Sequence, residues 1–199
     1  MVFEQHPKGV ITEPRKELRH SPPHSEEFAW KILSPAEMSD LVARTGRHQQ
    51  RYHGGCRLVA GCIPYRYKEE DGSTVEVLMI NTPSGPGLLF PKGGWENDET
   101  VEEAAKREAI EEAGVRGDIK DYIGEYTFKS KTHQDENCPE GLCKAAMFSL
   151  CVREELESWP EQSTRVRSWL GIPDAVKICR HKWMEDALRH FASMLETRG

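Results

Sequence analysis

The chain has 199 residues and lacks both a long apolar run and a dense cysteine framework. No stretch approaches the roughly 18 apolar residues of a membrane-spanning helix, so we expect no membrane partner. The amino end also lacks the apolar stretch and small-residue cleavage site of a secretory signal. The six cysteines form no CxxC pair, which favours reduced thiols inside a cell, in the cytoplasm or nucleus first and the mitochondrion second. Cys138 and Cys143 could form half of a zinc site, but no matching second pair follows.

Hydrophobic periodicity is scarce at the start of the chain, where prolines recur. We expect a flexible, poorly ordered leader over 1–38 and a single domain over 39–199. A mitochondrial or plastid presequence would be rich in Arg and Ser and poor in acids. The leader instead carries several glutamates, among them Glu4, Glu13, Glu17, Glu26 and Glu27.

The most informative feature that is present is a predicted helix with carboxylates on its apolar stripe. At about 100° per residue, Glu108, Glu111 and Glu112 fall on the same side as a row of alanines. An ionised carboxylate without a partner is very costly to bury. Three carboxylates that can converge on one point become tolerable beside a hard divalent cation, Mg²⁺ or its substitute Mn²⁺. A lone ExxEE would more often be a solvated acidic face, so the surrounding residues decide.

Local signals around this stripe support the metal site. Thr100 and Glu103 fit a capping box that would start the helix, and Gly114 fits the left-handed position that ends one. Gly93 and Gly94 let the preceding loop bring its backbone close to an ion.

Arg107 directly precedes Glu108, and Glu99 lies eight residues before Arg107. The guanidinium can therefore hold carboxylates in a bidentate arrangement. Residues 93–115 then match the Nudix box, G-x5-E-x7-R-E-U-x-E-E-x-G-U, at every fixed position, with Ala109 a small residue in a bulky slot. The chain resembles a Nudix hydrolase. The matched positions are Gly93, Glu99, Arg107, Glu108, Glu111, Glu112, Gly114 and Val115.

The resemblance implies an α/β fold, an α/β/α sandwich with a central mixed sheet. It implies that water attacks a phosphoanhydride with the help of Mg²⁺, which neutralises charge and orients the water. It also implies that Arg107 and Glu99 hold the ligands in place without touching the ion. We favour Glu111 as general base because it sits at the edge of the stripe, although family members differ in this assignment. The implied metal ligands are Glu108, Glu111, Glu112 and the Gly93 carbonyl, and the three glutamates are the implied catalytic residues.

Periodicity predicts the other elements independently, and their order suits a mixed sheet between helices. The expected strands are Arg57–Tyr65, Val75–Ile80, Leu88–Phe90, Tyr122–Phe128 and Ala145–Val152, and the expected closing helix is Trp183–Leu195.

Net charge places a constraint on the substrate. The formal charge is −6, yet a diphosphate is strongly anionic, so local cations must bind it. Three basic clusters indicate a small polyanionic phosphate substrate. Separately, we expect a monomer rather than an oligomer. The acidic balance and short length argue against nucleic acid, including RNA decapping. The clusters are Arg44, Arg47, Arg51 and Arg57; Lys129, Lys131, His133 and Lys144; and Arg165, Arg167, Arg180 and Lys182.

Segments outside the Nudix box narrow the resemblance to one branch of the family. The segments RYHGGCRLVAGCIPYR, LLFPKGGWE and WPEQSTRVRSWL resemble the diphosphoinositol polyphosphate phosphohydrolase branch, especially its plant members, over roughly Ser39 to His190. This implies cleavage of inositol pyrophosphates, with diadenosine polyphosphates as companion substrates. Two departures are Ser84, where the animal branch has arginine, and Lys92, where it has glycine. The positions that the match brings near substrate are Arg51, Arg57, Ser84, Lys92, Gly93, Gly94, Lys129, Lys131, His133, Arg167 and Lys182.

Two alternatives stay open. The chain could be a pyrophosphatase of the ADP-ribose or NADH type, or a catalytically weak module that binds a ligand on the same fold. Aromatic side chains could stack an adenine and so favour a nucleotide, although such residues more often lie in a core. The candidates are Trp95, Tyr126, Phe128, Trp159 and Trp169.

Overall fold

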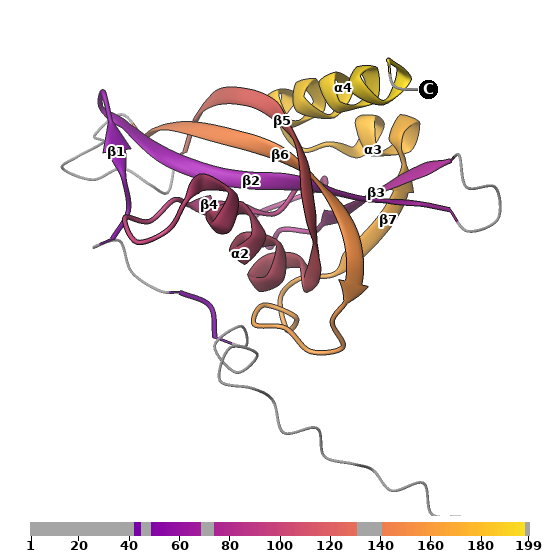
Figure 1. Cartoon of the computed structure of the whole chain (residues 1–199), viewed down its shortest axis with the longest axis horizontal. Coiled ribbons are helices and arrows are strands. Elements are labelled where there is room, and N and C mark those ends of the chain that lie inside the picture. Colours follow the sequence, from indigo (N-terminus) through magenta and orange to yellow (C-terminus); the bar gives the residue numbers. More distant parts are fainter. Residues whose placement is uncertain (1–41, 45–48, 69–73, 131–140, 198–199) are drawn as a thin grey trace, which may run out of the picture. The chain divides into compact units, whose positions relative to one another are not determined.

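The computed structural model describes residues 42–44, 49–68, 74–130 and 141–197, all within the compact unit that begins at Leu33. The leader expected over 1–38 lies outside these residues, as do Lys131, His133 and Cys138. Labels follow Figure 1. The described elements are β1 (Tyr52–His53), β2 (Cys56–Tyr67), β3 (Val75–Ile80), β4 (Lys92–Gly94), α2 (Val101–Ala113), β5 (Val115–Lys129), β6 (Leu142–Glu155), β7 (Arg167–Gly171), α3 (Ile172–Ile178) and α4 (Lys182–Glu196).

The strands form one mixed seven-stranded sheet with the path β5-β6-β2-β3-β7. Strands β2 and β6 are parallel, and the other pairs are antiparallel. One edge of β2 is divided between two partners, since Val59 to Gly61 pair with β4 and Tyr65 to Tyr67 pair with β3. This division brings the two glycines of β4 into the middle of the sheet, next to the segment that leads into α2.

Helices cover both faces of this sheet (Figure 1). Strand β2 is buried almost continuously, as expected for a strand packed on both sides. The Cys62 thiol points to the carbonyl of Ala105 on α2, 3.9 Å away, whereas the Tyr65 ring packs on Phe191 of α4 with centroids 5.1 Å apart. Cys62 and Tyr65 are an odd number of positions apart in one strand, so their side chains contact helices on opposite faces. The predicted α/β/α sandwich with a mixed sheet is confirmed.

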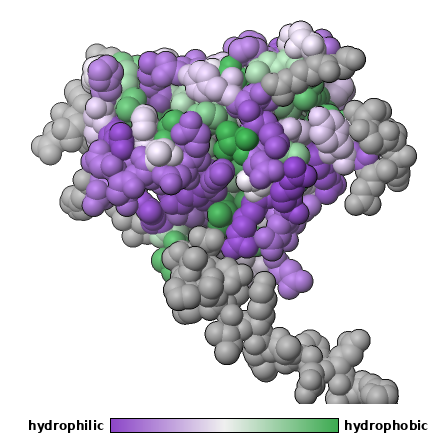
Figure 2. Space-filling view, viewed as in Figure 1, coloured by the Kyte–Doolittle hydropathy of each residue, from purple (hydrophilic) through white to green (hydrophobic). Residues whose placement is uncertain are grey.

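The closing helix α4 buries Met184, Ala187, Leu188 and Phe191, which repeat at the spacing of one helical face. Within the described part of the chain, no helix is both long and apolar enough to cross a bilayer. Figure 2 shows that hydrophilic side chains cover most of the face that carries α2, with hydrophobic colour confined to small areas.

The strand predictions differ from the structure in several places: β1, β4 and β7 were not predicted, and β5 begins at Val115 instead of Tyr122. Leu88–Phe90 makes only isolated bridges, of Leu88 to Cys179 and Leu89 to Ile80, and the strand follows at Lys92–Gly94. Leu89 and Phe90 are buried as expected, but single bridges to different partners do not make a ladder. Helix α3 was not predicted, because its seven residues bury only Ala175 and give no periodic signal.

Candidate active site

Helix α2 begins and ends where its local chemistry predicts. The Glu103 amide donates to Thr100 Oγ1 at 3.2 Å, and the Thr100 amide donates to Glu103 Oε2 at 2.8 Å, which completes the capping box. At the other end Gly114 adopts a left-handed conformation with φ 60°, and its amide donates to the Ile110 carbonyl at 3.0 Å. These caps fix which residues of α2 face the sheet.

The buried face of α2 carries the three predicted carboxylates among alanines. Glu108, Glu111 and Glu112 are 7%, 6% and 8% exposed. The Glu108 carboxylate lies directly against the backbone of Gly93, where any Cβ would overlap it. A side chain at position 93 would displace the Glu108 carboxylate, so glycine is what allows the Gly93 backbone to lie beside it.

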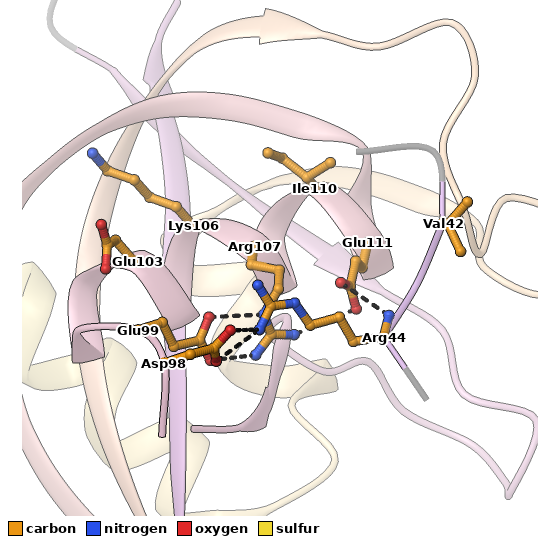
Figure 3. A pocket seen from close by; sticks show the side chains of 9 residues that line it. All are labelled: Val42, Arg44, Asp98, Glu99, Glu103, Lys106, Arg107, Ile110 and Glu111. Atoms are coloured by element: carbon orange, nitrogen blue, oxygen red, sulfur yellow. Dashed lines mark hydrogen bonds and ion pairs between the residues drawn. The ribbon is translucent and has the colours of Figure 1, made fainter. Parts of the chain in front are cut away.

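Arg107 joins this face to the preceding loop (Figure 3). Its Nε donates to Glu99 Oε2 at 3.0 Å and its Nη2 to Glu99 Oε1 at 2.8 Å, which is the bidentate geometry of a strong charge-assisted pair. Its Nη1 donates to Glu108 Oε1 at 2.7 Å, and Nη2 also reaches the Gly94 carbonyl at 2.9 Å. Arg107 thus holds the glycine loop and the first carboxylate of the face in one arrangement.

The three carboxylates do not converge on one point in this arrangement. Glu111 Oε1 accepts from the Arg44 amide at 3.3 Å. Glu112 accepts from the Lys92 amide at 2.8 Å and from Arg165 Nη2 at 2.6 Å. Across the described residues, no group of three His, Cys, Asp or Glu side chains is placed to hold an ion. Glu108 and Glu111 share one donor, Arg107 Nη1, at 2.7 and 3.4 Å, whereas Glu112 is held by different donors, so the predicted convergence requires these side chains to rotate.

Burial disfavours the charged form of these carboxylates, although arginines lie beside them. It raises the pKa of Glu108 to about 8, and the neighbouring charge of Glu112 adds to the effect. Burial likewise raises the pKa of Glu111 and of Glu112. A divalent cation would offset this penalty, and the donors are carboxylate and carbonyl oxygens, which suit a hard ion such as Mg²⁺ or Mn²⁺. The residues present therefore fit the metal that the sequence predicts.

A cleft of about 1360 Å³ opens over the carboxylates. Among the predicted substrate contacts it brings together Arg57, Ser84, Lys92, Gly93, Gly94, Lys129 and Lys182. Arg57 is buried and bonds to Gln50, and both side chains occupy the space beside Gly94. Lys131 and His133 fall outside the described residues.

Two predicted contacts do not line the cleft. Arg51 stacks on Trp95, 4.4 Å from the ring centroid, and donates to the Glu96, Asn97 and Glu99 carbonyls. Arg167 stacks on Trp159 and donates to the carbonyls of Gly114 and Leu156, both at 3.1 Å. Both guanidiniums donate to backbone carbonyls at the ends of α2, and their contact with substrate stays a prediction.

The cleft contains cations that the sequence match did not select, Arg44, Arg165 and Arg180. Arg165 takes the place predicted for Arg167, two residues away. The sequence signal was the basic pair itself. It could not tell which member faces the cleft, because Arg165 lies in irregular backbone just before β7 begins at Arg167, so no fixed period relates the two side chains. Arg180 is held by the Ser84 and Pro86 carbonyls at 2.8 and 3.0 Å.

A smaller pocket of about 420 Å³ lies on the other side of α2, between the helix and residues 42–44 (Figure 3). Here Arg44 Nη1 donates to Glu96 at 2.7 Å and to Asp98 at 3.1 Å. Of the three carboxylates, only Glu111 borders this pocket. The larger cleft, which all three carboxylates line, is therefore the candidate active site.

Comparison with known proteins agrees with this geometry. The NUDIX domain matches residues 57–191. Nudix hydrolase 16, mitochondrial, of Arabidopsis thaliana is 66% identical over 158 residues, which cover 76% of this chain and 88% of that protein. Diphosphoinositol polyphosphate phosphohydrolase 3-alpha of Mus musculus is 33% identical over 132 residues, 64% of this chain and 73% of its own.

A solved structure supports the fold. The C. elegans Ap4A hydrolase in a binary complex superposes with a TM-score of 0.54 at 23% identity, covering 70% of this chain and 98% of that one. Since the domain match spans most of the chain and includes the whole carboxylate face of α2, the chain belongs to the Nudix family and is a Nudix hydrolase.

Proposed function

We propose that this enzyme hydrolyses a phosphoanhydride in an inositol- or nucleoside-linked polyphosphate, with inositol pyrophosphates and diadenosine polyphosphates as the favoured substrates and Mg²⁺ as cofactor. One observation carries the proposal: in a protein of net charge −6, the cleft above the buried carboxylates is ringed by cations. A ring of this kind matches a ligand with several phosphates. Its members are Arg44, Arg57, Lys92, Lys129, Arg165, Arg180 and Lys182.

The roles within the site follow from this assignment. Glu108, Glu111, Glu112 and the Gly93 carbonyl would hold the ion, which when bound neutralises phosphate charge and acidifies the attacking water. Glu111 takes a proton from that water, and the raised pKa that burial gives this carboxyl suits a general base. The water oxygen bonds to phosphorus, the bridging P–O bond breaks, and the group that keeps the bridging oxygen leaves with a terminal phosphate. Nearby cations hold the non-bridging oxygens.

A nucleotide substrate has separate support. Phe128 and Trp183 stack with ring centroids 4.9 Å apart and planes 8° from parallel, and both line the cleft. An adenine could extend this stack. The indoles of Trp95, Trp159 and Trp169 are instead each covered by an arginine. Among the aromatic candidates from the sequence, Phe128 is therefore the one that favours diadenosine polyphosphates.

The proposed partner is a small polyanionic phosphate substrate. Relatives such as Nudix hydrolase 16 carry "mitochondrial" in their names, so for this chain we propose an intracellular location with the mitochondrion as a full alternative to cytoplasm and nucleus. Fluorescence microscopy of the tagged full chain with organelle markers tests the location.

A monomer is the proposed oligomeric state, and sedimentation equilibrium tests it.

A turnover panel tests the substrate. Inositol pyrophosphates, diadenosine polyphosphates, ADP-ribose and NADH are compared at equal Mg²⁺, and ¹⁸O-labelled water identifies the phosphorus that is attacked. We expect kcat/KM to be highest for one of the first two classes. A preference for ADP-ribose or NADH would favour the nucleotide pyrophosphatase alternative. Absence of turnover with every compound, despite saturable ligand binding, would favour a binding module.

A further inference from the structure

Arg165 joins a carboxylate of the catalytic helix to one outside it. Its Nη2 donates to Glu112 Oε1 at 2.6 Å, its Nε to Glu161 Oε2 at 2.9 Å and its Nη1 to the Asn81 carbonyl at 3.0 Å. The Arg165 side chain is only 14% exposed. Because the guanidinium has three separate acceptors, it can leave one of them and still be held by the other two.

Both oxygens of Glu112 are engaged. The Lys92 amide donates to Oε2 at 2.8 Å, and Arg165 Nη2 donates to Oε1. A divalent ion that binds Glu112 must therefore approach a carboxylate that a guanidinium already neutralises. In a buried site two cations on one carboxylate repel strongly, since little water screens them. Arg165 and the ion compete for Glu112.

The backbone around Arg165 is fixed, so this competition concerns the side chain alone. The Glu161 amide donates to the Glu111 carbonyl near the end of α2 at 3.1 Å, and the Arg165 amide donates to the Glu161 carbonyl at 2.9 Å. These bonds attach one turn of chain to the catalytic helix. Glu161 also lines the cleft. It can retain the guanidinium when Arg165 turns away from Glu112.

We infer that Arg165 is a positioning residue that couples ion binding at Glu112 to phosphate binding in the cleft. Without phosphate, the guanidinium neutralises Glu112 and weakens its hold on the ion. A phosphate group draws the guanidinium away, and Glu112 is released to the ion. Linkage makes the effect reciprocal, so the ion tightens phosphate binding by the same factor. The inference rests on the proposed function, because it takes Glu112 as an ion ligand.

Mn²⁺ binding tests this coupling without any measurement of activity. The electron paramagnetic resonance signal of free Mn²⁺ gives the Kd of wild type, Arg165→Met and the control Arg153→Met, in chloride or in sulfate at matched ionic strength. Sulfate serves as a phosphate mimic. Arg153 is a suitable control because it is an exposed arginine that pairs with one carboxylate, Asp118, at 3.0 Å.

We expect Arg165→Met to bind Mn²⁺ about tenfold more tightly than wild type in chloride, a coupling of ordinary size. Sulfate should tighten Mn²⁺ binding to wild type and to Arg153→Met several-fold, and it should leave Arg165→Met unchanged. A purely structural role predicts the opposite, since a disordered site binds the ion less well. Equal or weaker Mn²⁺ binding by a folded Arg165→Met would overturn the inference.

Wild type alone also decides the question if Arg165→Met does not fold. A Kd for Mn²⁺ that sulfate leaves unchanged would be enough to reject the coupling. Failure of the proposed function looks different: Mn²⁺ binding to wild type would then be absent, or unaffected by Glu108→Gln. The two ideas can therefore fail independently.

Discussion

Replacing Glu108 by glutamine should remove a large part of the pH dependence of stability that the protein shows in a metal chelator, and the part that stays comes from Glu111 and Glu112, whose pKa burial also raises. Burial and the charge of Glu112 raise the Glu108 pKa from 4.5 to about 8. A carboxyl whose pKa is higher in the folded state stabilises the fold below its unfolded pKa, and this contribution is lost as the pH rises through the folded value. The affected window therefore runs from about pH 4.5 to about pH 8.

The expected size follows from the shift. At 1.36 kcal/mol per pH unit, Glu108 would contribute roughly 3–5 kcal/mol that is lost across this window. For a domain of this length, that corresponds to a fall in Tm of roughly 10 °C. Acids whose pKa is lowered, such as Glu76 and Glu185, titrate below the window and do not contribute within it.

Differential scanning calorimetry in a chelator from pH 5 to 8.5 measures this loss. Wild type and the control Glu102→Gln should lose stability with rising pH, because Glu102 is an exposed residue on the same helix. Glu108→Gln should show a much flatter curve and a higher Tm at pH 8. Saturating Mg²⁺ should stabilise wild type most at high pH, where protons no longer compete for the carboxylates. Parallel curves for wild type and Glu108→Gln would refute the reasoning.

Three further substitutions test other parts of the site. Gly93→Ala should weaken Mg²⁺ binding roughly 10–100-fold, because its Cβ displaces the Glu108 carboxylate, and calorimetric titration with unchanged affinity would contradict this. Gly114→Ala should destabilise the fold by at least about 1 kcal/mol in urea, since φ is 60° and a Cβ would press on Trp159; unaltered stability would mean that this cap is dispensable. Arg57→Ala should raise KM more for inositol pyrophosphates than for ADP-ribose, and equal increases would argue against a polyanion at this wall of the cleft.

Local chemistry made α2 predictable from sequence. Capping bonds between Thr100 and Glu103, and the left-handed glycine at 114, involve neighbours in the chain, so the helix bounds follow from residue types alone. The sandwich and the buried carboxylate face also follow from periodicity together with the family resemblance. Strand β5 was predicted only in its second half, because register shifts near Gly117 and Gly124 interrupt its alternation.

Contacts between distant segments were not predictable in this way. Arg165 lies 53 residues from its partner Glu112, and Arg44 lies 67 residues from Glu111. Neither contact can be recognised from the spacing of residues or the composition of the sequence. Helix geometry places Glu108, Glu111 and Glu112 on one face, but the directions of the Glu111 and Glu112 side chains depend on these donors. The carboxylates therefore do not converge in the structure as the sequence predicted.

Arg51 and Arg167 clamp opposite ends of α2. Arg51 donates hydrogen bonds to the carbonyls of the segment that leads into the helix, and Arg167 donates one to the Gly114 carbonyl at the helix end. Loss of either clamp would let the carboxylates drift, so it should lower kcat and leave KM nearly unchanged. An alanine scan scored only by residual activity would therefore not distinguish the loss of a clamp from the loss of a phosphate ligand.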